Sequence, residues 1–332
     1  MQKQNHNGAK ILLTLIVLAG ICAAAIHFVD FVAVSDTFLG INYAPSTEMA
    51  ELIGKDEFTK TGERILKASR PELLEAVDFN SKCYSGTEEE NSVLGCYTNN
   101  TIYVYNIQNK DLDGIKETVL AHELLHAVWH RMGIDERRAL YQDIDAIYEA
   151  NKDELGEHMA GYASEDHYDE LHSVIGTQIS SDKLTESLRE HYAKYLVDQS
   201  RIVSYYDSYN GKFKVLEKRA TELEAQIETN RTRIETMTAK YESDAEDLLK
   251  NINSFNARAE NGDFADSASF YAERNELVAR QNQLQNDFES LNSLISETNA
   301  MIQEYNNSVI EVGKLYDSVN SRIQEPATQI QD

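Results

Sequence analysis

Residues 277–319 read LVARQNQLQNDFESLNSLISETNAMIQEYNNSVIEVGKLYDSV, a stretch without proline in which apolar residues recur at alternating spacings of three and four. This alternation, sustained over about six heptads, is typical of a helix in a coiled coil. The seam that it predicts consists of Leu277, Gln281, Leu284, Phe288, Leu291, Ile295, Thr298, Ile302, Tyr305, Val309, Val312, Tyr316 and Val319.

The preceding stretch, residues 216–259, carries the same alternation. Residues 261–266, NGDFAD, separate the two stretches, and an Asn-Gly pair followed by aspartates favours a turn and a new helix start. We therefore predict a long antiparallel coiled-coil helical hairpin over 206–325, reversing near residue 268, with a short tail at 326–332. The alternative is that both stretches pair with another chain, and the hairpin is also a possible surface for a protein partner. The first seam consists of Leu216, Ala220, Leu223, Ile227, Asn230, Ile234, Met237, Tyr241, Leu248, Ile252, Phe255 and Ala259.

The composition favours helices outside this hairpin as well. The only prolines are Pro45, Pro71 and Pro326, so residues 72–325 contain none, and an all-β sandwich or barrel, which needs many turns, is disfavoured. Asp and Glu number 56 against 31 Lys and Arg, which gives a net charge of −25. Because a chain this acidic repels phosphate backbones, we expect no nucleic-acid partner.

Residues 34–205 are predicted to form a separate, mainly helical domain with a short β element. Thr101–Ile107, TIYVYNI, is the best strand because β-branched and aromatic residues alternate along it. We expect helices at Lys116–Met132, closed by Gly133, and at Ser181–Asp198.

The first of these helices contains AHELLH at residues 121–126, an HExxH motif. His122 and His126 project from one helix face, one turn apart, and can bind one Zn²⁺. Glu123 lies beside the water that such an ion activates and can take its proton. We therefore expect a zinc-dependent enzyme with Glu123 as general base.

The motif leaves the third zinc ligand open. The metzincin pattern requires Gly and His where this chain has Trp129 and Met132, so that pattern does not apply. His130 lies about 12 Å along the helix from His122, too far to share the metal. The remaining candidates are Glu154, Glu157, His158, Glu165, His167, Glu170 and His172.

Residues 34–205 resemble zincin metallopeptidases of the gluzincin type, in which an edge strand precedes the HExxH helix and aligns an extended substrate. They also resemble a little-characterised group of bacterial membrane-anchored metallopeptidase-like proteins, which has no firm substrate to carry over. In that group an acidic residue often follows Gly-Thr, whereas this chain has Gln178, so that position receives no role. The stretches that carry this second resemblance are Leu94–Tyr97, Thr101–Ile107, Ala121–Ala127 and Glu170–Thr177.

The resemblance implies a zincin-like α+β domain, one catalytic Zn²⁺ and a peptide or protein substrate. Gluzincins take their third ligand from a glutamate on a downstream helix, which implies Glu170, with His172 as the alternative. Zincins also stabilise the oxyanion of the tetrahedral intermediate with a tyrosine or histidine. Candidates for that role are His191, Tyr192 and Tyr195.

The N-terminal segment is the clearest localisation signal. Residues 11–29 are almost uniformly apolar and nearly long enough to span a bilayer. We predict an uncleaved signal anchor in residues 1–33, with Lys3 and Lys10 keeping the N-terminus cytoplasmic and the later domains extracytoplasmic. The alternative is a cleaved signal peptide, which would release a secreted protein.

The cysteines are few. Besides Cys22 the chain holds only Cys83 and Cys96. Two cysteines in an exported domain predict one disulfide that closes a short loop. The alternative is two free thiols in a reducing compartment.

These features predict a zinc peptidase anchored at the extracytoplasmic face of a membrane. One alternative is a non-enzymatic envelope protein with a structural zinc site, whose hairpin serves as a spacer or docking rod. Another is a zinc hydrolase acting on envelope amide bonds other than peptides. Glu123 favours an enzyme, because a purely structural site would not need it.

Overall fold

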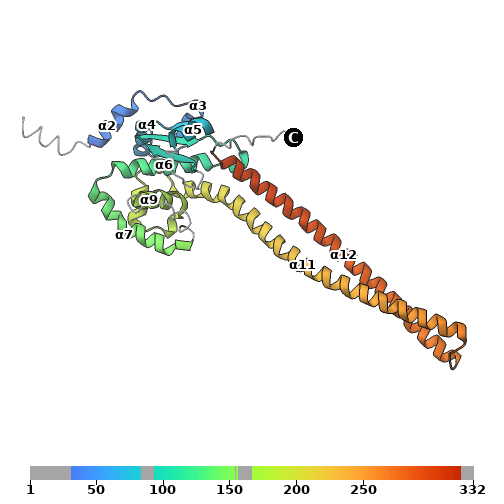
Figure 1. Cartoon of the computed structure of the whole chain (residues 1–332). Coiled ribbons are helices and arrows are strands. Elements are labelled where there is room, and N and C mark those ends of the chain that lie inside the picture. Colours follow the sequence, from blue (N-terminus) through green and yellow to red (C-terminus); the bar gives the residue numbers. More distant parts are fainter. Residues whose placement is uncertain (1–30, 84–92, 154, 156–166, 323–332) are drawn as a thin grey trace, which may run out of the picture. The chain divides into compact units, whose positions relative to one another are not determined.

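The computed structural model describes residues 31–83, 93–153, 155 and 167–322 (Figure 1). The chain divides into two compact units. The first consists of the residues up to Asn210 together with those from Ser318 onward, and the second spans Gly211–Asp317. Within the described ranges the chain is mainly helical with one small sheet, as the composition predicts. Its α-helices are α2 (Phe31–Gly40), α3 (Thr47–Ile53), α4 (Lys60–Ala68), α5 (Ala76–Cys83), α6 (Ile115–Arg131), α7 (Ile134–Ala150), α9 (His167–Gln178), α10 (Glu186–Tyr192), α11 (Gln199–Asn261) and α12 (Ser267–Val319), with 3-10 helices η1 (Lys110–Leu112) and η2 (Ser181–Lys183) and strands β1 (Glu72–Leu74), β2 (Gly95–Thr98) and β3 (Thr101–Tyr105).

The sheet of the first unit has the strand order β1-β3-β2. β1 runs parallel to β3, and β2 runs antiparallel to it with Cys96 opposite Tyr103. The predicted strand is confirmed as β3, where Ile102 and Val104 are fully buried. It is not the edge strand that the gluzincin resemblance implies, because β2 covers its outer side and occupies the edge itself.

The predicted helix at Lys116–Met132 is confirmed as α6, and most of its side chains are buried. It contacts α4, α9, β2 and β3, so the HExxH segment lies inside the domain. Gly133 follows the C-cap Met132, but it does not close the helix, because its φ of −66° is not the left-handed conformation of a closing glycine. Gly133 instead precedes α7, and its N–H donates a hydrogen bond to Oε2 of Glu136 (2.8 Å).

Helix α9 lies against α6 and α7. Gly176 permits the close approach, since a Cβ atom there would lie 2.4 Å from Cδ1 of Leu125 on α6. The resulting core buries side chains from α6, α7, α9 and α10, among others, which fixes α9 beside the HExxH segment. Its buried members are Leu125, Trp129, Leu140, Ile144, Ile147, Leu155, Leu171, Val174, Ile175, Ile179, Leu184, Leu188 and Tyr192.

The prediction of one helix over Ser181–Asp198 is wrong. The segment folds as η2 and the short α10, and α11 begins only at Gln199. The chain leaves helical geometry where Leu196 forms an antiparallel bridge with Phe58. Backbone hydrogen bonds to the segment around Glu57 therefore replace the helical ones at this point.

The predicted disulfide is confirmed between Cys83 and Cys96, with Cα atoms 5.8 Å apart. Cys83 is the last residue of α5, and Cys96 lies on β2. The bond therefore ties the edge strand of the sheet to a neighbouring helix.

The second unit confirms the helical hairpin, with α11 and α12 side by side in Figure 1. Cross-arm contacts include the rings of Phe213 and Tyr316, with centroids 5.0 Å apart. The backbone N–H of Ser269 donates to Oδ1 of Asp266 (2.7 Å) at the start of α12. The reversal lies between Asn261 and Ser267, slightly before the predicted residue 268.

The structure does not support the predicted single-pass membrane anchor, and we correct that localisation. Among the residues that the structure describes, none of the helices combines the length and the apolar character needed to cross a membrane. The apolar segment 11–29 and the tail 326–332 lie outside the described residues.

Candidate metal centre

His122 and His126 lie one turn apart on α6. Their ring centroids are 4.8 Å apart, and their Nε2 atoms approach to 3.1 Å. Both side chains are less than one-fifth exposed. The buried faces of α6 hold these rings where the helical period places them, on a single face.

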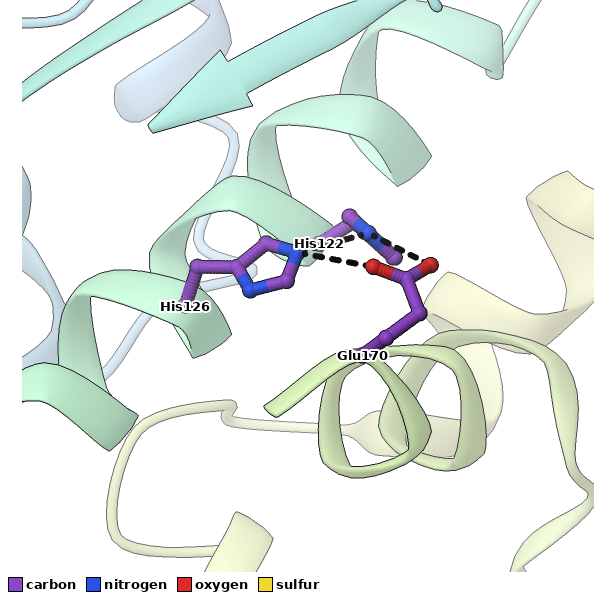
Figure 2. A group of neighbouring side chains, drawn as sticks. All are labelled: His122, His126 and Glu170. Atoms are coloured by element: carbon purple, nitrogen blue, oxygen red, sulfur yellow. Dashed lines mark hydrogen bonds and ion pairs between the residues drawn. The ribbon is translucent and has the colours of Figure 1, made fainter. Parts of the chain in front are cut away.

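Glu170, near the start of α9, completes the group. Its Oε1 lies 3.6 Å from Nε2 of His122, and its Oε2 lies 3.3 Å from Nε2 of His126. Figure 2 shows the carboxylate pointing from α9 toward both imidazoles. The three ligand atoms lie within 4.8 Å of one another, so these residues could hold a metal ion.

Asp169, directly before Glu170, orients the second histidine. Nδ1 of His126 donates to its Oδ1 (2.8 Å), and Nε2 of His130 lies 3.0 Å from its Oδ2. Burial raises the pKa of Asp169, but the hydrogen bonds from His126 and His130 outweigh it and lower the pKa to about 2. With its Nδ1 proton fixed in this way, a neutral His126 presents the lone pair of Nε2 to the ligand group.

This role of Asp169 was not predicted from the sequence. A metal-binding histidine usually donates its second N–H to a carboxylate or carbonyl, so a search for a carboxylate partner of His122 or His126 was the usable signal. His130, half exposed, lies on the far side of Asp169 from the ligand group, in keeping with its exclusion as a ligand.

Glu123 lies beside the group and is only 4% exposed. Burial raises its pKa, although the nearby His126 and His122 partly offset this. Among the described residues, its Oε2 has no hydrogen-bond partner. Gly95 of β2 makes room for this side chain, because a Cβ atom at Gly95 would lie 2.6 Å from Oε1 of Glu123.

These residues fit a metal ion on the chemistry of their donors. Two imidazole nitrogens and a carboxylate form a ligand set typical of catalytic zinc. Burial raises the pKa of Glu170, but the imidazoles of His122 and His126 outweigh it and hold the pKa well below its usual range. Glu170 is therefore an anion facing the imidazoles. Beside them, the buried Oε2 of Glu123 has no partner within the described part of the chain.

His172, the alternative ligand, lies apart from the group. It is fully buried, and its Nε2 pairs with Nε2 of His191 at 2.8 Å. Its ring lies 5.0 Å from that of Trp129 in the core behind the metal group. Glu170 and His172 are two residues apart on one helix, so their side chains point in different directions.

The candidates for oxyanion stabilisation lie in this same core. Tyr192 is fully buried, and its hydroxyl donates to the carbonyl of His172 (2.8 Å). The ring of His191 lies between His172 and Tyr195, with centroids 5.0 and 5.4 Å away. The structure therefore places these side chains in a packed aromatic cluster and not with Glu170.

Of the other candidate ligands, the structure describes only His167, which is not part of the group. His167 begins α9 and has ring contacts with Tyr148 and Tyr168. The remaining four, Glu154, Glu157, His158 and Glu165, lie outside the residues whose side chains are described.

Comparisons of the chain with models of known protein families, with curated proteins and with solved structures found no match. The geometry of His122, Glu123, His126 and Glu170 is therefore the basis for a function of this chain.

Proposed function

We propose that the first unit is a zincin-like zinc hydrolase that cleaves peptide bonds, with His122, His126 and Glu170 as metal ligands and Glu123 as general base. One observation carries this proposal. The Nε2 atoms of two histidines one helical turn apart converge with the Glu170 carboxylate, beside a buried glutamate whose Oε2 has no described partner.

Zinc is the best match to the donor set. Imidazole suits zinc, copper, iron and nickel, and a set of two histidines and one glutamate is common in zinc peptidases. With three protein ligands, such a site keeps one position open for water or substrate, whereas structural zinc sites are closed by four. His122, His126 and Glu170 would hold a zinc ion, which would supply Lewis-acid activation of water and of the substrate carbonyl.

Glu123 supplies the proton transfer. Burial favours the neutral form of its carboxyl and raises its pKa toward the working range of a general base. Its Oε2, which has no hydrogen-bond partner among the residues that the structure describes, would accept a proton from the attacking water and return it to the leaving amine. Asp169 keeps His126 in the tautomer that a ligand needs.

Strand β2 favours an extended peptide as the substrate. It is an edge strand, it contacts α6, and its first residue lies against Glu123. An extended chain that added to this edge would run past Glu123, with backbone hydrogen bonds setting its register.

Zinc content and hydrolysis of a peptide library by the purified full chain test the proposal. Wild-type protein should carry about one zinc and cleave peptides, whereas Glu123→Gln should keep the zinc and lose activity by about 10²-fold or more. Glu149→Gln, which removes an exposed carboxylate on α7, is the matched control and should behave as wild type. Zinc-loaded wild-type protein that cleaves no peptide would contradict an enzyme and favour the structural-site alternative.

A further inference from the structure

The intramolecular hairpin buries only part of the apolar surface of α12. The buried positions of this helix are Leu277, Leu291, Leu294, Thr298, Ser308 and Leu315. The heptad pattern also predicts Phe288, Ile302 and Val309 in the seam, but these side chains are 42%, 37% and 44% exposed. Arm α11 therefore packs mainly on one side of the predicted seam and covers the other side only in part.

The residues on this partly covered side form one row along α12, which we call the outer stripe. Its members follow one another at intervals of seven residues and so lie in a row along the helix. The two end members also contact α11, since Phe288 lies near the ring of Tyr241 and Tyr316 near that of Phe213. The outer stripe is made of Phe288, Ile295, Ile302, Val309 and Tyr316.

The next row of α12 beyond the outer stripe carries no charge either. Asn292, Asn299 and Asn306 are exposed and are again seven residues apart. Gln285 and Gly313 continue the row at its two ends. An apolar row bordered by an amide row is a surface that another helix can cover without burying an ion.

The acidic side chains of α12 lie off these two rows. Asp287 pairs with Lys240 of α11 at 3.4 Å, and Glu304 pairs with Arg219 at 2.6 Å. Both ion pairs are on the α11 side of the helix. The uncharged rows therefore form the face of α12 that another strongly acidic surface can approach without charge repulsion.

We propose that the outer stripe is the contact between two copies of this chain, in which α12 of each hairpin packs on α12 of the other and the two hairpins form a four-helix bundle. A two-fold contact brings a surface against itself, so in a chain of net charge −25 an uncharged face is the one that avoids self-repulsion. The outer stripe is also continuous with the α11–α12 seam, as expected of a helix that contacts two neighbours.

The test is the mass of the full chain in solution, measured by light scattering from about 1 to about 100 µM. Wild type should be a dimer, and Ile302→Glu with Val309→Glu should weaken association by about 100-fold or more, because two charges are buried in each half of the contact. Ser293→Glu with Ala300→Glu is the matched control. It adds the same two charges, seven residues apart, at exposed positions off both rows, and should stay dimeric.

Far-UV circular dichroism should show unchanged helicity for both double variants, which separates lost association from lost folding. A wild-type chain that stays monomeric over the whole range would overturn the proposal and leave the outer stripe to a helix of a different protein. Equal association of the Ile302/Val309 variant and the wild type would also overturn it.

Discussion

Nδ1 of His126 lies 2.8 Å from Oδ1 of Asp169, the residue directly before Glu170. Helix α9 thus places the adjacent carboxylates of Asp169 and Glu170 beside the two ring nitrogens of His126, one at each nitrogen. Asp169 fixes the orientation of the ring, and Glu170 lies 3.3 Å from its Nε2. The packing of α9 on α6 therefore sets both the ligand group and the tautomer of one of its members.

Asp169→Asn should weaken zinc binding by about 10- to 100-fold, because the amide keeps the shape of the side chain but loses its charge. Competition with a chromophoric chelator, at fixed pH, measures the affinity. Asp145→Asn is the control, since Asp145 accepts a hydrogen bond from Tyr168 (3.1 Å) and is not a member of the ligand group. Equal zinc affinities for Asp169→Asn and wild type would show that Asp169 does not orient His126.

Gly95→Ala should lower the free energy of unfolding by roughly 1–3 kcal/mol, because the new methyl group has no room. It would lie 2.6 Å from both Oε1 of Glu123 and Cγ1 of Val119. Peptide hydrolysis should fall as Glu123 is displaced, while zinc content stays near one per chain.

Urea denaturation of zinc-loaded protein measures this effect of Gly95→Ala. Gly211→Ala is the control, because outside its own helix turn no described atom lies within 4 Å of a Cβ at that position. It should be neutral or stabilising by up to about 1 kcal/mol. A Gly95→Ala protein as stable and as active as wild type would contradict the close packing of β2 on Glu123.

His191 should make the metal-free protein less stable in acid. Burial, helped by the Lys194 ammonium, lowers the pKa of His191 from 6.5 to about 4 in the folded chain. Between these values the unfolded chain binds the proton and the folded chain does not, so the free energy of unfolding falls as the pH falls through this window. From about pH 7 to about pH 5 this one side chain should cost about 2 kcal/mol.

Comparing wild type with His191→Gln isolates this contribution. Chemical denaturation of each protein in the presence of a chelator, at about pH 7 and about pH 5, gives the change in its free energy of unfolding between the two pH values. The variant should lose about 2 kcal/mol less than wild type over the interval. Identical pH dependence would mean that His191 takes up its proton in the folded protein as readily as in the unfolded one.

Replacing Cys83 and Cys96 together with serine should lower the free energy of unfolding by about 3 kcal/mol, because the disulfide closes a short loop in the unfolded chain. For the wild type, thermal unfolding with and without a reductant compares the stability of the reduced chain with that of the disulfide-bonded chain. Thiol counting should find one free thiol before reduction and three after it, since Cys22 is the third cysteine. Cys22→Ser should leave the stability unchanged, and three free thiols in the native protein would contradict the bond.

Local patterns made some elements predictable. The heptads of 277–319 and the turn residues after Asn261 specify a hairpin, and the structure has one. The strand Thr101–Tyr105 and the HExxH helix were also clear, because each has its own periodicity and length. The short β1 and β2 strands were not, since three or four residues carry no usable period and are held by pairing with β3.

The sequence by itself determined the hairpin, the two cysteines of the disulfide and the His122–His126 face, because each depends on spacing along one helix or on a count of residues. Only the tertiary structure decided between Glu170 and His172 and brought in Asp169, because that choice depends on how α9 rotates and packs against α6. It also decided which side of α12 meets α11, since the apolar surface of that helix is wider than one partner can cover. Periodicity fixes which residues share a face, and packing fixes what that face meets.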